Sequence, residues 1–185
     1  MRRSRLGFLF AFIAILGGLA FLADRATRPS GPGRQDIAHP EIISPAALYA
    51  VSFPDLAGSE KSIGSWQGKV LVLNFWATWC APCKEEIPSF MRLQRAYGDR
   101  GVVFVGVAVD ERDKAETYAK EMAINYPILV GGMNAMDLAQ RTGNRQGGVP
   151  FTVVADRQGR IVRTYLGPVK ESELASTFES VLAAR

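Results

Sequence analysis

The chain has 185 residues, of which 48% are hydrophobic and 22% charged, and its formal net charge is +4. These proportions exclude an intrinsically disordered chain and are typical of one ordinary globular domain with appendages. The basic residues are spread along the sequence rather than clustered with aromatic residues, so nucleic-acid binding is not expected.

The N-terminal region has the pattern of an export signal. Residues 1–5 carry three arginines, and residues 6–23 form an uncharged run. Such a run is at the lower limit for a bilayer-spanning helix but longer than a secretory signal core, and Phe21 stands where a cleavage site needs a small side chain. We therefore expect a transmembrane signal anchor over residues 6–23, with a cleaved signal peptide as the alternative. The excess of arginines before this run predicts a cytoplasmic N-terminus and a periplasmic or otherwise extracytoplasmic remainder.

Residues 24–45 are rich in proline and glycine and show no helical or strand periodicity, which predicts a semi-extended linker. The single histidine, His39, lies in this segment and is interpreted as a solvated residue. The folded domain is expected over residues 46–185.

The folded domain begins with a predicted strand or hairpin over 49–59 and one helical turn over 62–67. Residues 69–76 (KVLVLNFW) and 102–109 (VVFVGVAV) are apolar runs of strand length, as expected for strands buried on both faces. Further helices are predicted over 82–97, 112–122, 135–142 and 171–184, and further strands over 127–130, 151–155 and 160–166. This order implies an α/β fold with a mixed central sheet flanked by helices, in which the first two core strands are parallel.

The two cysteines, Cys80 and Cys83, are separated only by Ala81 and Pro82. A stabilising disulfide normally closes a long loop, and this spacer closes almost none. Zinc requires four ligands and the chain has no further cysteine, so neither a metal site nor a cofactor is expected. A thiolate pair could still bind Cu(I), which leaves a copper chaperone as an alternative to a redox-active dithiol.

The position of Cys80 favours the redox interpretation. This thiol stands where a core strand gives way to a helix, and the helix N-terminus stabilises a thiolate, which is the nucleophile of disulfide exchange. Cys83 lies one turn further, more buried, and can attack the mixed disulfide that Cys80 forms. Trp76 and Trp79 are expected either to cover the pair or to pack in the core.

Three separated features resemble the TlpA/ResA-type membrane-anchored thiol:disulfide oxidoreductases of the thioredoxin superfamily. They are FWATWCAPCK over 75–84, Pro88 five residues after Cys83, and GGVPFTVVADRQGRI over 147–161. The resemblance extends from about Tyr49 to the C-terminus. It implies a thioredoxin-like fold with a family-type helix and strand inserted after the second core strand.

The resemblance also implies site residues. A cis peptide bond between Val149 and Pro150 is expected beside the nucleophilic cysteine, where Val149 can pair with an extended substrate peptide and Trp79 contributes to binding. Asn74 replaces the buried aspartate of ordinary thioredoxin, and an amide cannot accept a proton from Cys83. We therefore predict that Glu86 is the proton acceptor, with a solvated helix acid as the alternative.

These observations predict a membrane-tethered thiol-disulfide oxidoreductase that reduces disulfides in extracytoplasmic proteins, during cytochrome c maturation or copper-site assembly. The expected electron donor is a transmembrane reductase of the DsbD/CcdA kind, and a monomer is expected. A proline directly before the second cysteine favours reduction by analogy, although spacing does not encode a reduction potential. A Cu(I)-binding chaperone and a peroxiredoxin-like peroxidase remain the alternatives.

Overall fold

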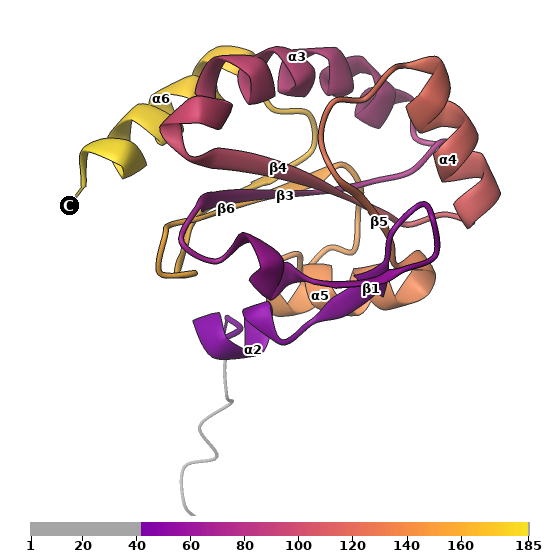
Figure 1. Cartoon of the computed structure of the whole chain (residues 1–185), viewed down its shortest axis with the longest axis horizontal. Coiled ribbons are helices and arrows are strands. Elements are labelled where there is room, and N and C mark those ends of the chain that lie inside the picture. Colours follow the sequence, from indigo (N-terminus) through magenta and orange to yellow (C-terminus); the bar gives the residue numbers. More distant parts are fainter. Residues whose placement is uncertain (1–41, 185) are drawn as a thin grey trace, which may run out of the picture. The chain divides into compact units, whose positions relative to one another are not determined.

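Residues 42–184 are described by the computed structural model, and they include a sheet with the strand order β5-β4-β3-β6-β7 (Figure 1). Strands β3, β4 and β5 are parallel, whereas β6 is antiparallel to both β3 and β7. The predicted mixed sheet and parallel first pair are therefore confirmed. The predicted signal anchor and residues 24–41 of the predicted linker lie outside the described residues. Within 42–184 no helix has the length and apolar character needed to cross a membrane.

Helices and strands alternate along most of the domain. In chain order they are α2 (Pro45–Tyr49), β1 (Ser52–Pro54), β2 (Glu60–Ser62), η1 (Ile63–Trp66), β3 (Val70–Trp76), α3 (Ala81–Tyr97), η2 (Gly98–Arg100), β4 (Val102–Ala108), α4 (Arg112–Glu121), β5 (Ile128–Val130), α5 (Gly132–Arg141), β6 (Phe151–Ala155), β7 (Ile161–Leu166) and α6 (Glu171–Ala183). The inserted helix and strand expected after the second core strand are α4 and β5.

The predicted strand or hairpin at 49–59 is a hairpin that starts later than expected, because Tyr49 ends a helix. Ser44 caps α2 by accepting a hydrogen bond from the Ala47 N–H, and Pro45 occupies the first helical turn, where its missing N–H loses nothing. The hairpin therefore starts at Ser52 and closes on Glu60–Ser62.

Strands β3 and β4 pair in register from Val70 opposite Val102 to Trp76 opposite Ala108. All seven residues of β3 are buried, as an apolar run with helices on both sides requires. Gly106 on β4 makes room for the Trp76 indole, because a Cβ at that position would lie 2.9 Å from its Nε1. This close approach keeps Trp76 in the core behind the cysteines.

Each face of the sheet has its own buried cluster, and different helices cover the two faces (Figure 1). Helices α3, α4 and α6 contribute to the cluster that also contains Cys80 and Cys83. Helices α2 and α5, with the segment around β1, contribute to the other cluster. Both cysteines therefore pack on one face of the sheet.

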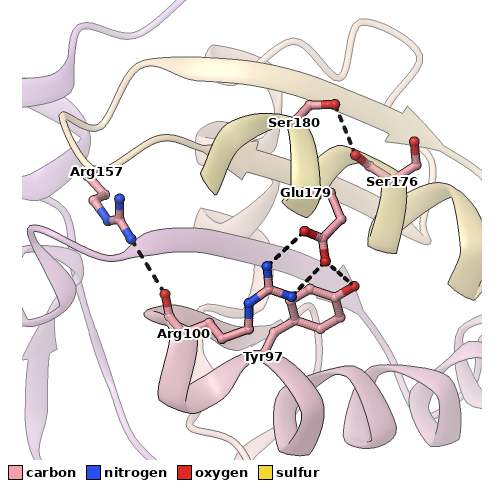
Figure 2. Close-up of polar contacts among 6 residues, drawn as sticks. All are labelled: Tyr97, Arg100, Arg157, Ser176, Glu179 and Ser180. Atoms are coloured by element: carbon pink, nitrogen blue, oxygen red, sulfur yellow. Dashed lines mark hydrogen bonds and ion pairs between the residues drawn. The ribbon is translucent and has the colours of Figure 1, made fainter. Parts of the chain in front are cut away.

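Aromatic packing and an ion pair join helix α6 to the C-terminal end of α3. The buried Phe178 ring lies edge-on to Tyr97, with the ring centroids 5.3 Å apart. At the surface Glu179 accepts hydrogen bonds from both terminal nitrogens of Arg100, at 2.6 and 2.8 Å, and from the Tyr97 hydroxyl (Figure 2). These contacts hold the C-terminal half of α6 against the end of α3 and the following turn.

Candidate active site

Cys80 and Cys83 form a disulfide bond at the start of α3. Cys80 is the N-cap of this helix, and its Sγ accepts a hydrogen bond from the Cys83 N–H at 3.2 Å. Cys80 is 6% exposed, Cys83 is fully buried, and the intervening Ala81 and Pro82 are exposed. An incoming thiolate therefore reaches Cys80 more readily, and the helix N-terminus stabilises negative charge on that sulfur once it is released.

The two tryptophans before the motif have different environments. Trp76 is buried in the same cluster as the cysteines, and its ring centroid lies 5.6 Å from that of Tyr118. Trp79 is 67% exposed, next to Cys80. Core packing is therefore the correct interpretation for Trp76, whereas Trp79 presents an aromatic surface beside the disulfide.

The loop that carries Trp79 is held by Asp110, which follows β4. Its Oδ2 accepts hydrogen bonds from the Thr78 N–H at 2.8 Å and from the Thr78 hydroxyl at 2.6 Å. Burial acts to raise the pKa of Asp110, but these bonds, with one from the Glu111 N–H, outweigh it and hold the pKa below its usual range. Asp110 is therefore an ionised anchor for the approach to Cys80.

Glu86 is buried on α3, three residues after Cys83 and hence on the same side of the helix. Its Oε1 accepts a hydrogen bond from Asn74 Nδ2 at 2.9 Å, and its Oε2 accepts one from the Val169 N–H at 3.3 Å. Burial raises the pKa of Glu86 to about 7, and the two hydrogen bonds limit the rise. The carboxyl group can therefore take up or release a proton near neutral pH, and it is not the solvated helix acid of the alternative interpretation.

The Val149–Pro150 peptide bond is cis. Phe151, the next residue, is opposite Phe75 in the antiparallel pair of β6 and β3. Pro150 therefore lies at the end of the sheet where β3 leads into the cysteine motif. The preceding turn is held by Asn144, whose side chain donates to the Gly148 carbonyl and accepts from the Gly147 N–H. The predicted residues Val149 and Pro150 are thus brought to the same end of the sheet as Cys80.

Two contributors to the site are absent from the sequence-based predictions. Thr152 accepts the second hydrogen bond of the Asn74 amide, at 3.1 Å, and Val169 supplies a backbone donor. A signal existed for Thr152, since it is a single polar residue in the apolar strand FTVVA. A backbone donor has no sequence signal. In residues 42–184 no cluster of three or more histidine, cysteine or acidic side chains could hold a metal ion.

The site contains the parts that a dithiol exchange reaction needs. Cys80 is the accessible sulfur at a helix N-terminus, Cys83 is a buried sulfur bonded to it, and Glu86 is a buried acid whose pKa is about 7. The disulfide form is the oxidised product of such an exchange. The dithiol form is the matching reductant.

Comparisons with known proteins agree with this site. The redoxin family profile matches residues 44–182. The thiol-disulfide oxidoreductase ResA of Geobacillus thermodenitrificans is 29% identical over 128 residues, which cover 69% of this chain and 71% of that protein. The thioredoxin-like protein YneN of Bacillus subtilis is 33% identical over 129 residues, covering 66% of this chain and 71% of YneN.

A crystal structure of a thiol:disulfide interchange protein from Chlorobium tepidum superposes with a TM-score of 0.63 at 29% identity, covering 72% of this chain and 93% of that one. The matched region of this chain contains the cysteine motif, the buried acid and the cis-proline strand in one domain. The chain therefore belongs to the redoxin family, and it is a thiol-disulfide oxidoreductase similar to the ResA type.

Proposed function

We propose that this oxidoreductase acts as a membrane-tethered reductant of disulfides in extracytoplasmic proteins. The observation that carries the proposal is Glu86, a buried acid with a pKa of about 7 on the same side of α3 as the buried Cys83. A reductant has to deprotonate its second thiol away from water, and Glu86 can accept that proton at neutral pH. The proposed membrane location rests on the arginines and the apolar run of residues 1–23. The proposed direction, reduction of the substrate, rests on the Ala81-Pro82 spacer.

The reaction begins with the dithiol form. The Cys80 thiolate attacks one sulfur of a substrate disulfide, the substrate S–S bond breaks, and the other substrate sulfur leaves as a thiolate and takes a proton from solvent. A mixed disulfide now joins Cys80 to the substrate. Trp79, exposed beside Cys80, and the backbone of Val149 are the surfaces proposed to hold the substrate chain.

The second step releases the substrate. Glu86 accepts the proton of the Cys83 thiol, and the Cys83 thiolate attacks Cys80 Sγ, which breaks the mixed disulfide. The second substrate sulfur leaves as a thiolate and takes a proton from solvent. Two electrons have moved to the substrate, and the protein ends as the Cys80–Cys83 disulfide. A membrane reductase of the DsbD/CcdA kind is the proposed source of the electrons that restore the dithiol. Cysteines of apocytochrome c or of copper-site proteins are the proposed substrates.

The first test is the two-electron reduction potential of the full 185-residue chain, equilibrated with glutathione and dithiothreitol and followed by tryptophan fluorescence. A value near or below the roughly −270 mV of thioredoxin is expected for a reductant. A value near roughly −120 mV would instead make the protein a disulfide donor. If no reversible couple is found and Cu(I) binds with one-to-one stoichiometry, the copper chaperone replaces the reductase.

The proposed location has its own test. A cysteine-free variant, with Cys80 and Cys83 changed to serine, receives one new cysteine at the exposed Ser172. In intact cells this cysteine is expected to react with a membrane-impermeant maleimide, and the protein is expected in the membrane fraction. A cysteine that reacts only after lysis would place the domain in the cytoplasm and overturn the proposed location.

A further inference from the structure

We propose that Thr152 is a positioning residue for Glu86, because its hydroxyl fixes the Asn74 side chain with the amide nitrogen, rather than the carbonyl oxygen, toward the carboxyl group. The consequence for the rate of disulfide exchange rests on the proposed role of Glu86 as proton acceptor. The positioning of Glu86 by Thr152 is independent of that role.

The three side chains come from three elements and meet in the interior. Asn74 on β3 and Thr152 on β6 are directly opposite each other in the antiparallel register, so their side chains share one face of the sheet. That face is the one covered by α3, which carries Glu86. Asn74 Nδ2 donates to Glu86 Oε1 at 2.9 Å and to Thr152 Oγ1 at 3.1 Å. The exposed fractions are 1% for Asn74, 0% for Thr152 and 5% for Glu86, so water does not replace these partners.

The hydrogen bonds available to the amide decide its orientation. In the observed orientation both N–H groups of Asn74 have acceptors, and its Oδ1 is buried without a partner among the described residues. If the amide turned over, Oδ1 would face Glu86 and Thr152, and both N–H groups would point to the place where Oδ1 lies now. Both N–H groups would then lose the acceptors that they have now, which is unfavourable for buried donors. An orphaned acceptor is the more tolerable of the two arrangements.

Thr152 contributes half of that preference. Without its hydroxyl, the observed orientation leaves one N–H of Asn74 without its present acceptor, so the amide turns over more easily. A turned amide presents a carbonyl oxygen to Glu86, which stabilises the protonated acid and destabilises the carboxylate. Loss of the hydroxyl should therefore make Glu86 bind its proton more tightly.

Other groups facing Glu86 do not supply this control. The Val169 N–H, from the segment before α6, donates to the other carboxylate oxygen. Tyr126, before β5, has its pKa raised by burial and then by the charge of Glu86, so it stays neutral at physiological pH. Cys80 caps α3, Cys83 lies on it, and the two are bonded to each other. No lysine or arginine among the described residues contributes to the pKa shift of Glu86. The orientation of Asn74 is therefore the adjustable part of this environment.

The experiment measures the carboxyl ¹³C shift of Glu86 against pH in the full chain, kept as the disulfide form. Glu86→Gln assigns the signal. Thr152→Val removes the hydroxyl with little change of shape and is expected to raise the pKa of Glu86 by about one unit, which is a tenfold change in proton affinity. Thr152→Ser keeps the hydroxyl and should return the pKa to the wild-type value.

Thr142→Val is the matched control. Thr142 is also fully buried, and its hydroxyl donates to carbonyl groups of α5, a helix of the opposite cluster. This variant should lose stability without moving the pKa of Glu86. If Thr152→Val does not fold, Thr152→Ala provides a second side chain without a hydroxyl.

An unchanged pKa in the hydroxyl-free variant, or equal shifts in the valine and serine variants, would overturn the proposal, since neither result depends on the hydroxyl. The pH midpoint of the exchange rate is then measured on the same proteins. A midpoint that follows the carboxyl pKa supports both the positioning role and the proton acceptor. A carboxyl pKa that moves while the midpoint does not supports the positioning role of Thr152 and removes Glu86 from the reaction.

Discussion

Asn74 and Asn144 are equally buried, each 1% exposed, and yet their side chains bond to different kinds of group. Asn144 directs its amide to the backbone, donating to the Gly148 carbonyl at 2.8 Å and accepting from the Gly147 N–H at 3.0 Å. Asn74 directs its amide only to side chains and keeps an oxygen without a partner among the described residues.

The difference separates structural from chemical use of a buried polar group. Around Asn144 the amide is matched by backbone groups that never change charge, which fixes the turn before Pro150. Around Asn74 the principal partner is Glu86, which does change charge, so hydrogen bonds and protonation are linked. Burial alone does not distinguish the two regions, but their response to pH should.

The largest expected effect is on the pH dependence of stability. The pKa of Glu86 is raised from 4.5 to about 7 on folding, so between those pH values the folded state holds a proton that the unfolded state has lost. Stability should therefore fall as pH rises through this window, by about 3 kcal/mol in total, and stay low above it. Glu86→Gln should abolish this fall, as measured by denaturant unfolding at pH 5 and pH 8.

Glu85→Gln is the control for that variant, because Glu85 is the exposed neighbour on the same helix. It should keep the wild-type pH dependence. If Glu86→Gln retains the fall in stability above pH 5, the pH dependence does not come from the Asn74–Glu86 region.

A smaller effect is expected at the other asparagine. Asn144→Ala removes the two side-chain hydrogen bonds that hold the turn at Gly147 and Gly148, which should lower the free energy of unfolding by about 2 kcal/mol at every pH. The titration of Glu86 should stay unchanged. Asn134→Ala, at an exposed position on α5, is the matched control and should be nearly neutral. If the free energy of unfolding lost in Asn144→Ala depends on pH, the two asparagine regions do not differ in the way described.

Asp110 lies between the two cases, since it is ionisable but bonded to Thr78 and to the Glu111 N–H. Its lowered pKa means that its stabilisation is present above the usual value of 3.8 and is lost as pH falls through the lower folded pKa. Asp110→Asn should cost about 1 kcal/mol at pH 7 and flatten the acid limb of the stability curve. Asp137→Asn, at an exposed site, should leave that limb as it is.

The smallest effect on stability is expected at Trp79. With 67% of its surface exposed, Trp79→Ala should change the free energy of unfolding by less than about 0.5 kcal/mol. Exchange with a protein disulfide should slow by about tenfold, whereas exchange with glutathione disulfide should not. Met133→Ala, which removes another exposed apolar side chain, is the control for surface effects. Equal slowing with both substrates would mean that Trp79 acts on Cys80 itself.

The sequence was sufficient for the parts of the fold that local pattern determines. The apolar runs at 69–76 and 102–109 became the two buried parallel strands, and the alternation of strands and helices produced the mixed sheet. Ser44 and Pro45 begin a helix that ends at Tyr49, the first residue of the predicted strand or hairpin, because a cap followed by proline favours a helix there.

The site was predictable only where a side chain carries the chemistry. The two cysteines and Glu86 stand out by residue type and spacing, and the resemblance supplied Val149 and Pro150. The Asn74–Thr152 contact joins residues 78 positions apart, through a strand register that periodicity does not specify. The Val169 donor is a backbone group and leaves no trace in the sequence.

The two outer strands of the sheet are the places where a strand from another chain could add to it. Strand β5 has only three residues, and Asp55 bridges to Leu129 on its free side. Strand β7 pairs with β6 through a register irregularity and exposes the charged Arg163 between the exposed apolar residues Val162 and Leu166. Short, irregular or charged edges resist the addition of a foreign strand. The two edges of the sheet therefore disfavour strand pairing between copies of this domain, which lowers its tendency to aggregate by that route.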